Sequence, residues 1–178
     1  TADPSDDVSF DAPGNIGEAD AWSLETQLTL PLRALLPGAQ ITASGTFWQT
    51  EVTDPITGRI RDFSGQPEAE VSIDFRQDLN ALQLAWGLTY FKQAQNQSFR
   101  FNEIDTYEEG PWIDAFVEST AIDGLRLRLV AANIFDGEIT RERRFFAPDR
   151  AGNVDRIENR FREFAYDPWF VFSVSGSF

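Results

Sequence analysis

The chain has 178 residues, a formal net charge of −14, and neither cysteine nor histidine. Without these two residue types it cannot contain a disulfide framework, thiolate chemistry, a Ser-His-Asp triad or most kinds of zinc site. The negative charge argues against a nucleic-acid partner, which would require a basic face.

The composition is that of an all-β protein. Hydrophobic residues make up 42% of the chain, enough for a sizeable core, and Pro and Gly recur at intervals typical of turns. No window approaches the ~20 consecutive apolar residues that a membrane-spanning helix needs. Strands of a membrane barrel, however, alternate between apolar and polar residues and leave almost no hydropathy signal.

Seven segments alternate in this way, and we expect each to form a strand. In chain order they cover residues 22–30, 40–52, 68–77, 82–91, 112–119, 125–135 and 169–178. In the first, Leu24, Leu28 and Leu30 share one face, and Glu25 and Gln27 lie on the other. Alternation alone is compatible with both a membrane barrel and a soluble sandwich.

The lengths of the connections favour a membrane barrel. Short connections (31–39, 78–81 and 120–124) alternate with long ones (53–67, 92–111 and 136–168). In an up-and-down sheet every second connection lies at the same end, so all the long loops gather at one rim. Outer-membrane barrels have this asymmetry, with long loops outside and short turns in the periplasm.

We therefore predict an antiparallel up-and-down transmembrane β-barrel portion of about seven strands. An odd number of strands places the N-terminus outside the cell and the C-terminus in the periplasm, whereas a bacterial single-chain barrel has an even number of strands. We expect residues 1–178 to form one C-terminal segment of a larger barrel.

Aromatic residues lie at the long-loop ends of the predicted strands, where an interfacial girdle would lie at headgroup depth. They are Trp22, Trp48, Tyr90, Trp112, Phe135 and Trp169.

Charged residues on the polar faces are expected to point into the barrel lumen, because charge facing lipid is costly. They are Glu70, Asp74, Arg76, Asp114, Glu118, Arg126 and Arg128. One interpretation makes them contacts to a plug or a substrate path. The favoured one makes them a solvated wall with neutralising pairs.

The final segment, Pro168–Phe178, resembles the closing strand of outer-membrane proteins. It ends in Phe178, with Phe170, Phe172, Val174 and Gly176 at every second position before it. The resemblance implies that the periplasmic barrel-assembly machinery recognises this strand as an insertion signal.

The segment Leu125–Asp136 resembles the penultimate strand of TonB-dependent receptors, which carries an Asn-Leu-Phe-Asp-like sequence before an Arg-rich loop. Here the corresponding residues are Asn133–Asp136 and Arg141–Phe146. Residues 14–20 and 52–58 are also similar to loop sequences of that family.

This resemblance implies part of a 22-stranded barrel that takes up a siderophore, cobalamin or saccharide with energy relayed by TonB. The partners it implies are the N-terminal part of the same barrel with its plug domain, the TonB complex reached through that part, and outer-membrane lipid and lipopolysaccharide. The plug cannot be located in this chain.

Charged loops offer further hypotheses. Two acidic clusters, Asp3, Asp6, Asp7 and Asp11 and then Glu103, Asp105, Glu108 and Glu109, could hold Ca²⁺, but their spacing matches no fixed calcium loop. The segment 136–167 interleaves seven Arg with carboxylates. It could grip an anionic ligand, but we predict internal salt bridges. We predict no metal, no cofactor and no enzymatic activity, since no carboxylate pair stands out by position.

Two alternatives remain open at this stage. One is a passive outer-membrane porin with the same wall. The other is a soluble acidic β-sandwich that binds carbohydrate through Trp48 and Trp112.

Overall fold

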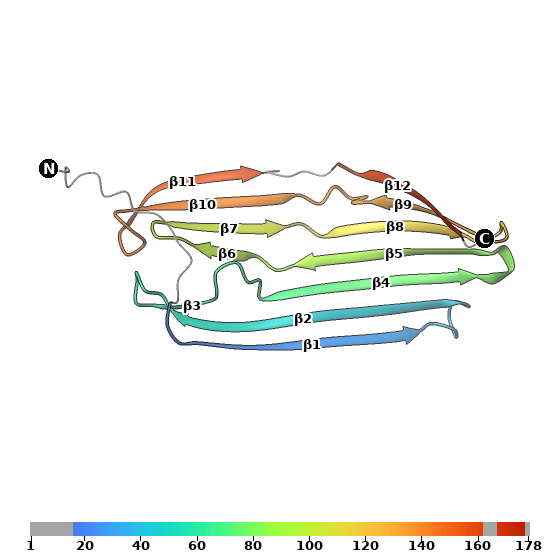
Figure 1. Ribbon diagram of the computed structural model, residues 1–178, viewed down its shortest axis with the longest axis horizontal. Helices are drawn as coiled ribbons and strands as arrows, with labels where there is room; N and C mark the ends of the chain where they lie inside the picture. The colour runs from blue at the N-terminus through green and yellow to red at the C-terminus, as the bar shows by residue number, and fades with distance from the viewer. Residues whose placement is uncertain (1–15, 162–166, 177–178) are drawn as a thin grey trace.

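The computed structural model describes residues 16–161 and 167–176, and these residues form strands with one short 3-10 helix (Figure 1). The elements are β1 (Ala19–Pro31), β2 (Ala39–Thr53), β3 (Ile60–Arg61), β4 (Ala69–Leu79), η2 (Asn80–Leu82), β5 (Leu84–Gln93), β6 (Asn96–Phe99), β7 (Glu103–Glu109), β8 (Trp112–Ser119), β9 (Leu125–Ala132), β10 (Ile139–Ala147), β11 (Asn153–Phe161) and β12 (Trp169–Gly176). Within the described ranges, no helix is long and apolar enough to cross a membrane.

Seven strands form the main sheet in the order β1-β2-β4-β5-β8-β9-β12, with β3 beside the end of β2. Every neighbouring pair is antiparallel, and the order follows the chain. This confirms the predicted antiparallel up-and-down sheet. Strand ends differ from the prediction by up to three residues, and two of these differences have a clear local cause. β5 starts at Leu84 because η2 and left-handed Gln83 precede it, and β9 ends at Ala132 because Asn133 leaves the extended conformation.

The register brings most of the large apolar residues of the seven strands onto one face, which we call the apolar face. Ala43 of β2 lies opposite Ile73 of β4, and Ile73 lies opposite Tyr90 of β5. Members of this face are Leu24, Leu28, Leu30, Ile41, Ala43, Phe47, Val71, Ile73, Phe75, Leu84, Leu88, Tyr90, Ile113, Ala115, Val117, Leu125, Leu127, Leu129, Ala131, Phe170, Phe172 and Val174.

No second layer covers the apolar face in the described part of the chain. The main contacts of its strands are with their sheet neighbours and with adjoining segments, and Phe170 is 73% exposed. A soluble β-sandwich would instead stack a second sheet on this face. The described strands therefore lack the packing that the sandwich alternative requires.

The long connections contain strands, which corrects the prediction that they are loops. β6 and β7 lie in the second long connection, β10 and β11 in the third, and together they form a four-stranded sheet in the order β11-β10-β7-β6. We call it the loop sheet. Figure 1 shows it beyond the ends of β5, β8 and β9, away from the short turns. β7 and β10 escaped prediction because charged residues fill them and hide any hydrophobic period.

Gly87 is a close-packed point of the main sheet and gives a test of the register. A Cβ at Gly87 would lie 2.2 Å from the carbonyl oxygen of Phe75 and 2.5 Å from a ring carbon of Phe116. We expect Gly87→Ala to lower the free energy of unfolding by about 1–3 kcal/mol through overpacking. Denaturant unfolding followed by tryptophan fluorescence measures this.

The matched control is Gly45→Ala in β2, also in a strand interior. There the nearest atom to an added Cβ is the end of the Phe47 ring, at 3.2 Å, which can move. Equal destabilisation by the two substitutions would contradict the β5–β8 register.

Candidate functional site

The second face of the main sheet, the polar face, carries all seven charged residues that the sequence placed there. For example, Asp74 lies opposite Thr89, and Thr89 lies opposite Asp114. The seven are Glu70, Asp74, Arg76, Asp114, Glu118, Arg126 and Arg128. That this face lines a lumen stays a prediction.

Near the short turns, three arginines surround one carboxylate. Glu118 has a side chain only 7% exposed and pairs with Arg76 at 3.3 Å, Arg128 at 3.4 Å and Arg126 at 3.8 Å. A carboxylate this buried requires such partners, because desolvation without compensation is costly. Arg126 is 61% exposed, so its pair with Glu118 contributes little.

Nearer the long connections, carboxylates of the polar face accept hydrogen bonds from neutral donors. Asp74 accepts from the Thr89 hydroxyl at 2.8 Å, and Glu70 accepts from the Gln93 amide at 2.7 Å. Asp114 accepts from the backbone N–H of Asn133 at 2.8 Å. The polar face is therefore acidic toward the long connections and carries its arginines toward the short turns.

The Asn133–Asp136 motif, singled out by its resemblance to the receptor family, forms a tight turn after β9. Asn133 is fully buried and left-handed, with φ 51°. Its Oδ1 accepts from the N–H of Gly137 at 2.7 Å, and its carbonyl accepts from the N–H of Asp136 at 3.0 Å. Asn tolerates this conformation, and its side chain satisfies a backbone N–H of the turn. The turn directs the chain from the main sheet into β10.

The six predicted girdle aromatics do not form one band on a single face. Trp22 and Tyr90 share the apolar face, and Phe135 lies beyond the end of β9. The other three, Trp48, Trp112 and Trp169, are on the polar face. The girdle was expected because these residues lie at strand ends. Successive residues of a strand face opposite sides of the sheet, so Trp48, Trp112 and Trp169 do not belong to a girdle on the apolar face.

The closing strand has the predicted alternation in its described part. Phe170, Phe172, Val174 and Gly176 lie on the apolar face, opposite alternate residues of β9. Phe178 lies outside the described residues. Recognition of this strand as an assembly signal stays a prediction.

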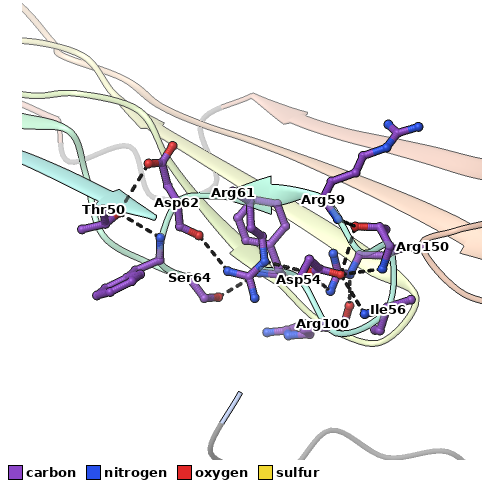
Figure 2. A network of polar contacts seen from close by, with 12 residues as sticks. Thr50, Asp54, Ile56, Arg59, Arg61, Asp62, Ser64, Arg100 and Arg150 are labelled. Carbon is purple, nitrogen blue, oxygen red and sulfur yellow. Dashed lines mark hydrogen bonds and ion pairs between the residues drawn. The ribbon is translucent and has the colours of Figure 1, made fainter. Parts of the chain in front are cut away.

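A buried charge network joins the long connections (Figure 2). Asp54, 1% exposed, follows β2, and its Oδ2 accepts from Arg61 Nε and from Arg150 Nη2, both at 2.6 Å. Its Oδ1 accepts from the backbone N–H groups of Ile56 at 3.0 Å and Thr57 at 2.9 Å.

Arg150 extends this network to the second long connection, because its Nε donates to the carbonyl of Arg100. All three long connections are thereby joined through Asp54 and Arg150. Burial raises the pKa of Asp54, but the hydrogen bonds from Arg150, Arg61 and the two backbone N–H groups outweigh it and hold the pKa well below its ordinary value. Asp54 is therefore charged and fully paired.

The loop sheet contains two further ion pairs between β7 and β10. Arg143 Nε lies 2.6 Å from Glu103 Oε1, and Arg141 holds Asp105 in a two-pronged contact at 2.7 and 2.6 Å. The hydrogen bond from Arg143 lowers the pKa of Glu103 against the opposing effect of burial, and that from Arg141 does the same for Asp105. Such planar paired contacts are the strong form of this interaction.

The prediction of internal salt bridges at 136–167 is confirmed in part. Arg144 and Arg156 do pair within that segment. Arg141, Arg143 and Arg150 pair with carboxylates of the other two long connections, and Arg143 also lies 3.6 Å from Glu158 within the segment. The buried ion pair of Asp54 could not be predicted from the sequence, because its partner Arg150 is 96 residues away.

In the acidic cluster considered for Ca²⁺, Glu103 and Asp105 form ion pairs with arginines. Across residues 16–161 and 167–176, no three acidic side chains are grouped as a metal site would require. The other cluster, Asp3 to Asp11, lies outside the described residues.

Comparisons with protein-family models, with curated proteins and with solved structures found no match for this chain.

The buried network predicts the effect of Asp54→Asn, which leaves Arg61 and Arg150 without their anion. Breaking a buried pair from one side costs about 3–5 kcal/mol, so the long connections should separate. Hydrogen exchange followed by mass spectrometry should show faster exchange in residues 54–62 and 149–152. Asp155→Asn, an exposed carboxylate on β11, is the control. Unchanged exchange in Asp54→Asn would contradict the joining role of Asp54.

The stability of the loop sheet should also depend on pH. The pKa values of Asp54, Glu103 and Asp105 are lowered by folding, so their contribution is complete above the ordinary carboxyl pKa of about 4 and is lost as the pH falls through the lower folded values. Hydrogen exchange at stepped pH should show β7 and β10 opening only below about pH 4. Opening between pH 7 and 5 would contradict this assignment.

Proposed function

We propose that this chain forms the C-terminal wall and outside loops of a TonB-dependent outer-membrane receptor for active uptake of a scarce nutrient of the siderophore, cobalamin or saccharide class. The observation that carries the proposal is the uncovered apolar face, continuous over seven strands, opposite a polar face. An exposed apolar surface of this extent is typical of contact with lipid or another protein.

The distribution of charge on the apolar face supports contact with lipid. Within the seven strands, the residues on this face include three charged side chains, Asp20, Glu51 and Lys92. All three lie at the long-connection ends of their strands, at the depth where a bilayer gives way to headgroups and water. Between these ends and the short turns the face is free of charge, as a hydrocarbon layer requires.

The two edges of the main sheet support its completion into a barrel. β1 pairs only with β2 and β12 only with β9 among the described strands. Unpaired backbone groups are not tolerated in lipid, so a membrane wall of this kind needs neighbours on both sides. We assign these neighbours to the N-terminal part of the same barrel, which would carry the plug and reach TonB.

The two ends of the sheet support the orientation. Long connections gather at one end, where the loop sheet and Asp54 network hold them in a fixed shape, and short turns gather at the other. Outer-membrane barrels place long loops outside. This orientation puts β12 where the barrel-assembly machinery would recognise its closing sequence, and puts the loop sheet beside lipopolysaccharide.

A passive porin would share the wall, the edges and the loops. The Asn133–Asp136 turn before the arginine-rich β10 favours the receptor, since that sequence is the one that resembles the receptor family.

The test is mass spectrometry of the detergent-extracted outer-membrane particle. We expect peptides of this 178-residue sequence in one particle with a plug-bearing N-terminal part, on the same or a second polypeptide. A barrel particle without a plug would contradict the receptor proposal and favour the porin. Recovery of the chain as a monomer from a detergent-free soluble fraction would overturn the membrane proposal.

A further inference from the structure

A cavity lies between the first two long connections, beside the Asp54 network. Its volume is about 280 Å³, and among its lining residues are Asp62, Phe63, Glu68, Gln95 and Gln97. We call it the loop cavity. At the small end of the range for ligand pockets, it has room for about one ring of a small molecule.

The walls of the loop cavity are fixed by hydrogen bonds between the two connections and from the first connection to β2. The N–H of Gly65 donates to the carbonyl of Gln97 at 2.8 Å, and the N–H of Phe99 donates to the Ser64 hydroxyl at 2.9 Å. The N–H of Phe63 donates to Thr50 Oγ1 at 3.0 Å. A pocket whose backbone is already held loses little entropy when a ligand binds.

The buried network also positions one aromatic wall of the cavity. The guanidinium of Arg61 lies 4.4 Å from the ring centroid of Phe99, and that of Arg150 lies at 5.5 Å. Both arginines are held by Asp54, as Figure 2 shows. The ring of Phe99 is thus fixed by the same charge that joins the three connections.

The chemistry of the lining selects against anions. Asp62 and Glu68 contribute two carboxylates, and no Lys or Arg is among the lining residues in the described part of the chain. A phosphate or carboxylate ligand would be repelled without a compensating cation. The lining therefore suits a neutral or a cationic group.

Three glutamine amides favour the neutral group. Gln66 Nε2 donates to the Pro67 carbonyl and Gln97 Nε2 donates to Thr106 Oγ1, which leaves each a second amide N–H and an oxygen acceptor. Gln95 adds a third amide to the lining. A cation has no acceptor for those N–H groups, whereas every hydroxyl of a sugar both donates and accepts. The rings of Phe63 and Phe99 add apolar surface for the C–H face of such a ligand.

We propose that the loop cavity binds one neutral, polyhydroxylated ring, a single neutral sugar unit of the ligand that is captured. Capture for uptake rests on the proposed receptor function, while binding itself depends on the cavity alone.

Saturation-transfer NMR on the full chain in a sugar-free detergent tests this inference. The probes are the methyl glycosides of glucose, galactose and mannose, with the 6-phosphates and 2-amino forms of the same hexoses beside them. We expect a neutral glycoside to bind with a dissociation constant on the order of millimolar. The phosphates should bind more weakly. No transfer to any neutral glycoside would overturn the proposal, and binding of the amino sugars alone would make the cavity a cation site.

A matched pair of variants locates the binding. Gln66→Ala removes a lining amide and should raise the dissociation constant about three- to tenfold, the value of one hydrogen bond. Unlike Gln95, Gln66 does not also line the neighbouring cavity beside Arg141 and Arg144. Gln49→Ala removes an exposed amide on β2 outside the cavity and should leave it unchanged. Equal effects would overturn the assignment to the loop cavity.

The two proposals fail separately. Glycoside binding without a plug-bearing partner would retain the sugar site and remove the receptor. A plug-bearing particle whose chain binds no neutral glycoside would retain the receptor and remove the sugar site.

Discussion

The cross-strand register is the constraint on which the rest of this structure depends. Side chains alternate between the two faces of a strand, so a slip of one residue in any pairing would transfer a whole strand's apolar set to the polar side. The observed pairings keep the apolar side chains on the same face from Leu24 of β1 to Phe172 of β12. One consistent parity creates an uncovered apolar face and, at the same time, brings Arg76, Glu118 and Arg128 together.

The long connections are stabilised in a different way. They have few buried apolar residues, and their shape depends on paired charge: Asp54 between two arginines, and the Arg141 and Arg143 pairs of the loop sheet. Such pairs specify a geometry because each guanidinium fits its carboxylate in few orientations. A surface built in this way stays polar enough to face water while it holds a cavity open.

The main sheet could be predicted from sequence because its signal is local. Alternation along residues 22–30 or 125–132 needs no knowledge of a partner, and the alternation of short and long connections fixed the topology. β7 and β10 could not be predicted, because their alternation is between charged residues whose partners lie elsewhere in the chain. The ion pair between Asp54 and Arg150 could not be predicted for the same reason. A position at a strand end does not determine which face a residue occupies, so Trp48 and Trp112 lie on the polar face although they are at strand ends.

The central claim is that the apolar face meets lipid and the polar face meets water. The chain has no cysteine, so a single cysteine can carry a spin label at each of Val71, Ser72, Ile73 and Asp74 in turn along β4. In the bilayer-reconstituted protein, we predict that labels at Val71 and Ile73 collide with dissolved oxygen and that labels at Ser72 and Asp74 collide with a water-soluble nickel chelate. Equal access of the nickel chelate to all four positions would contradict the claim.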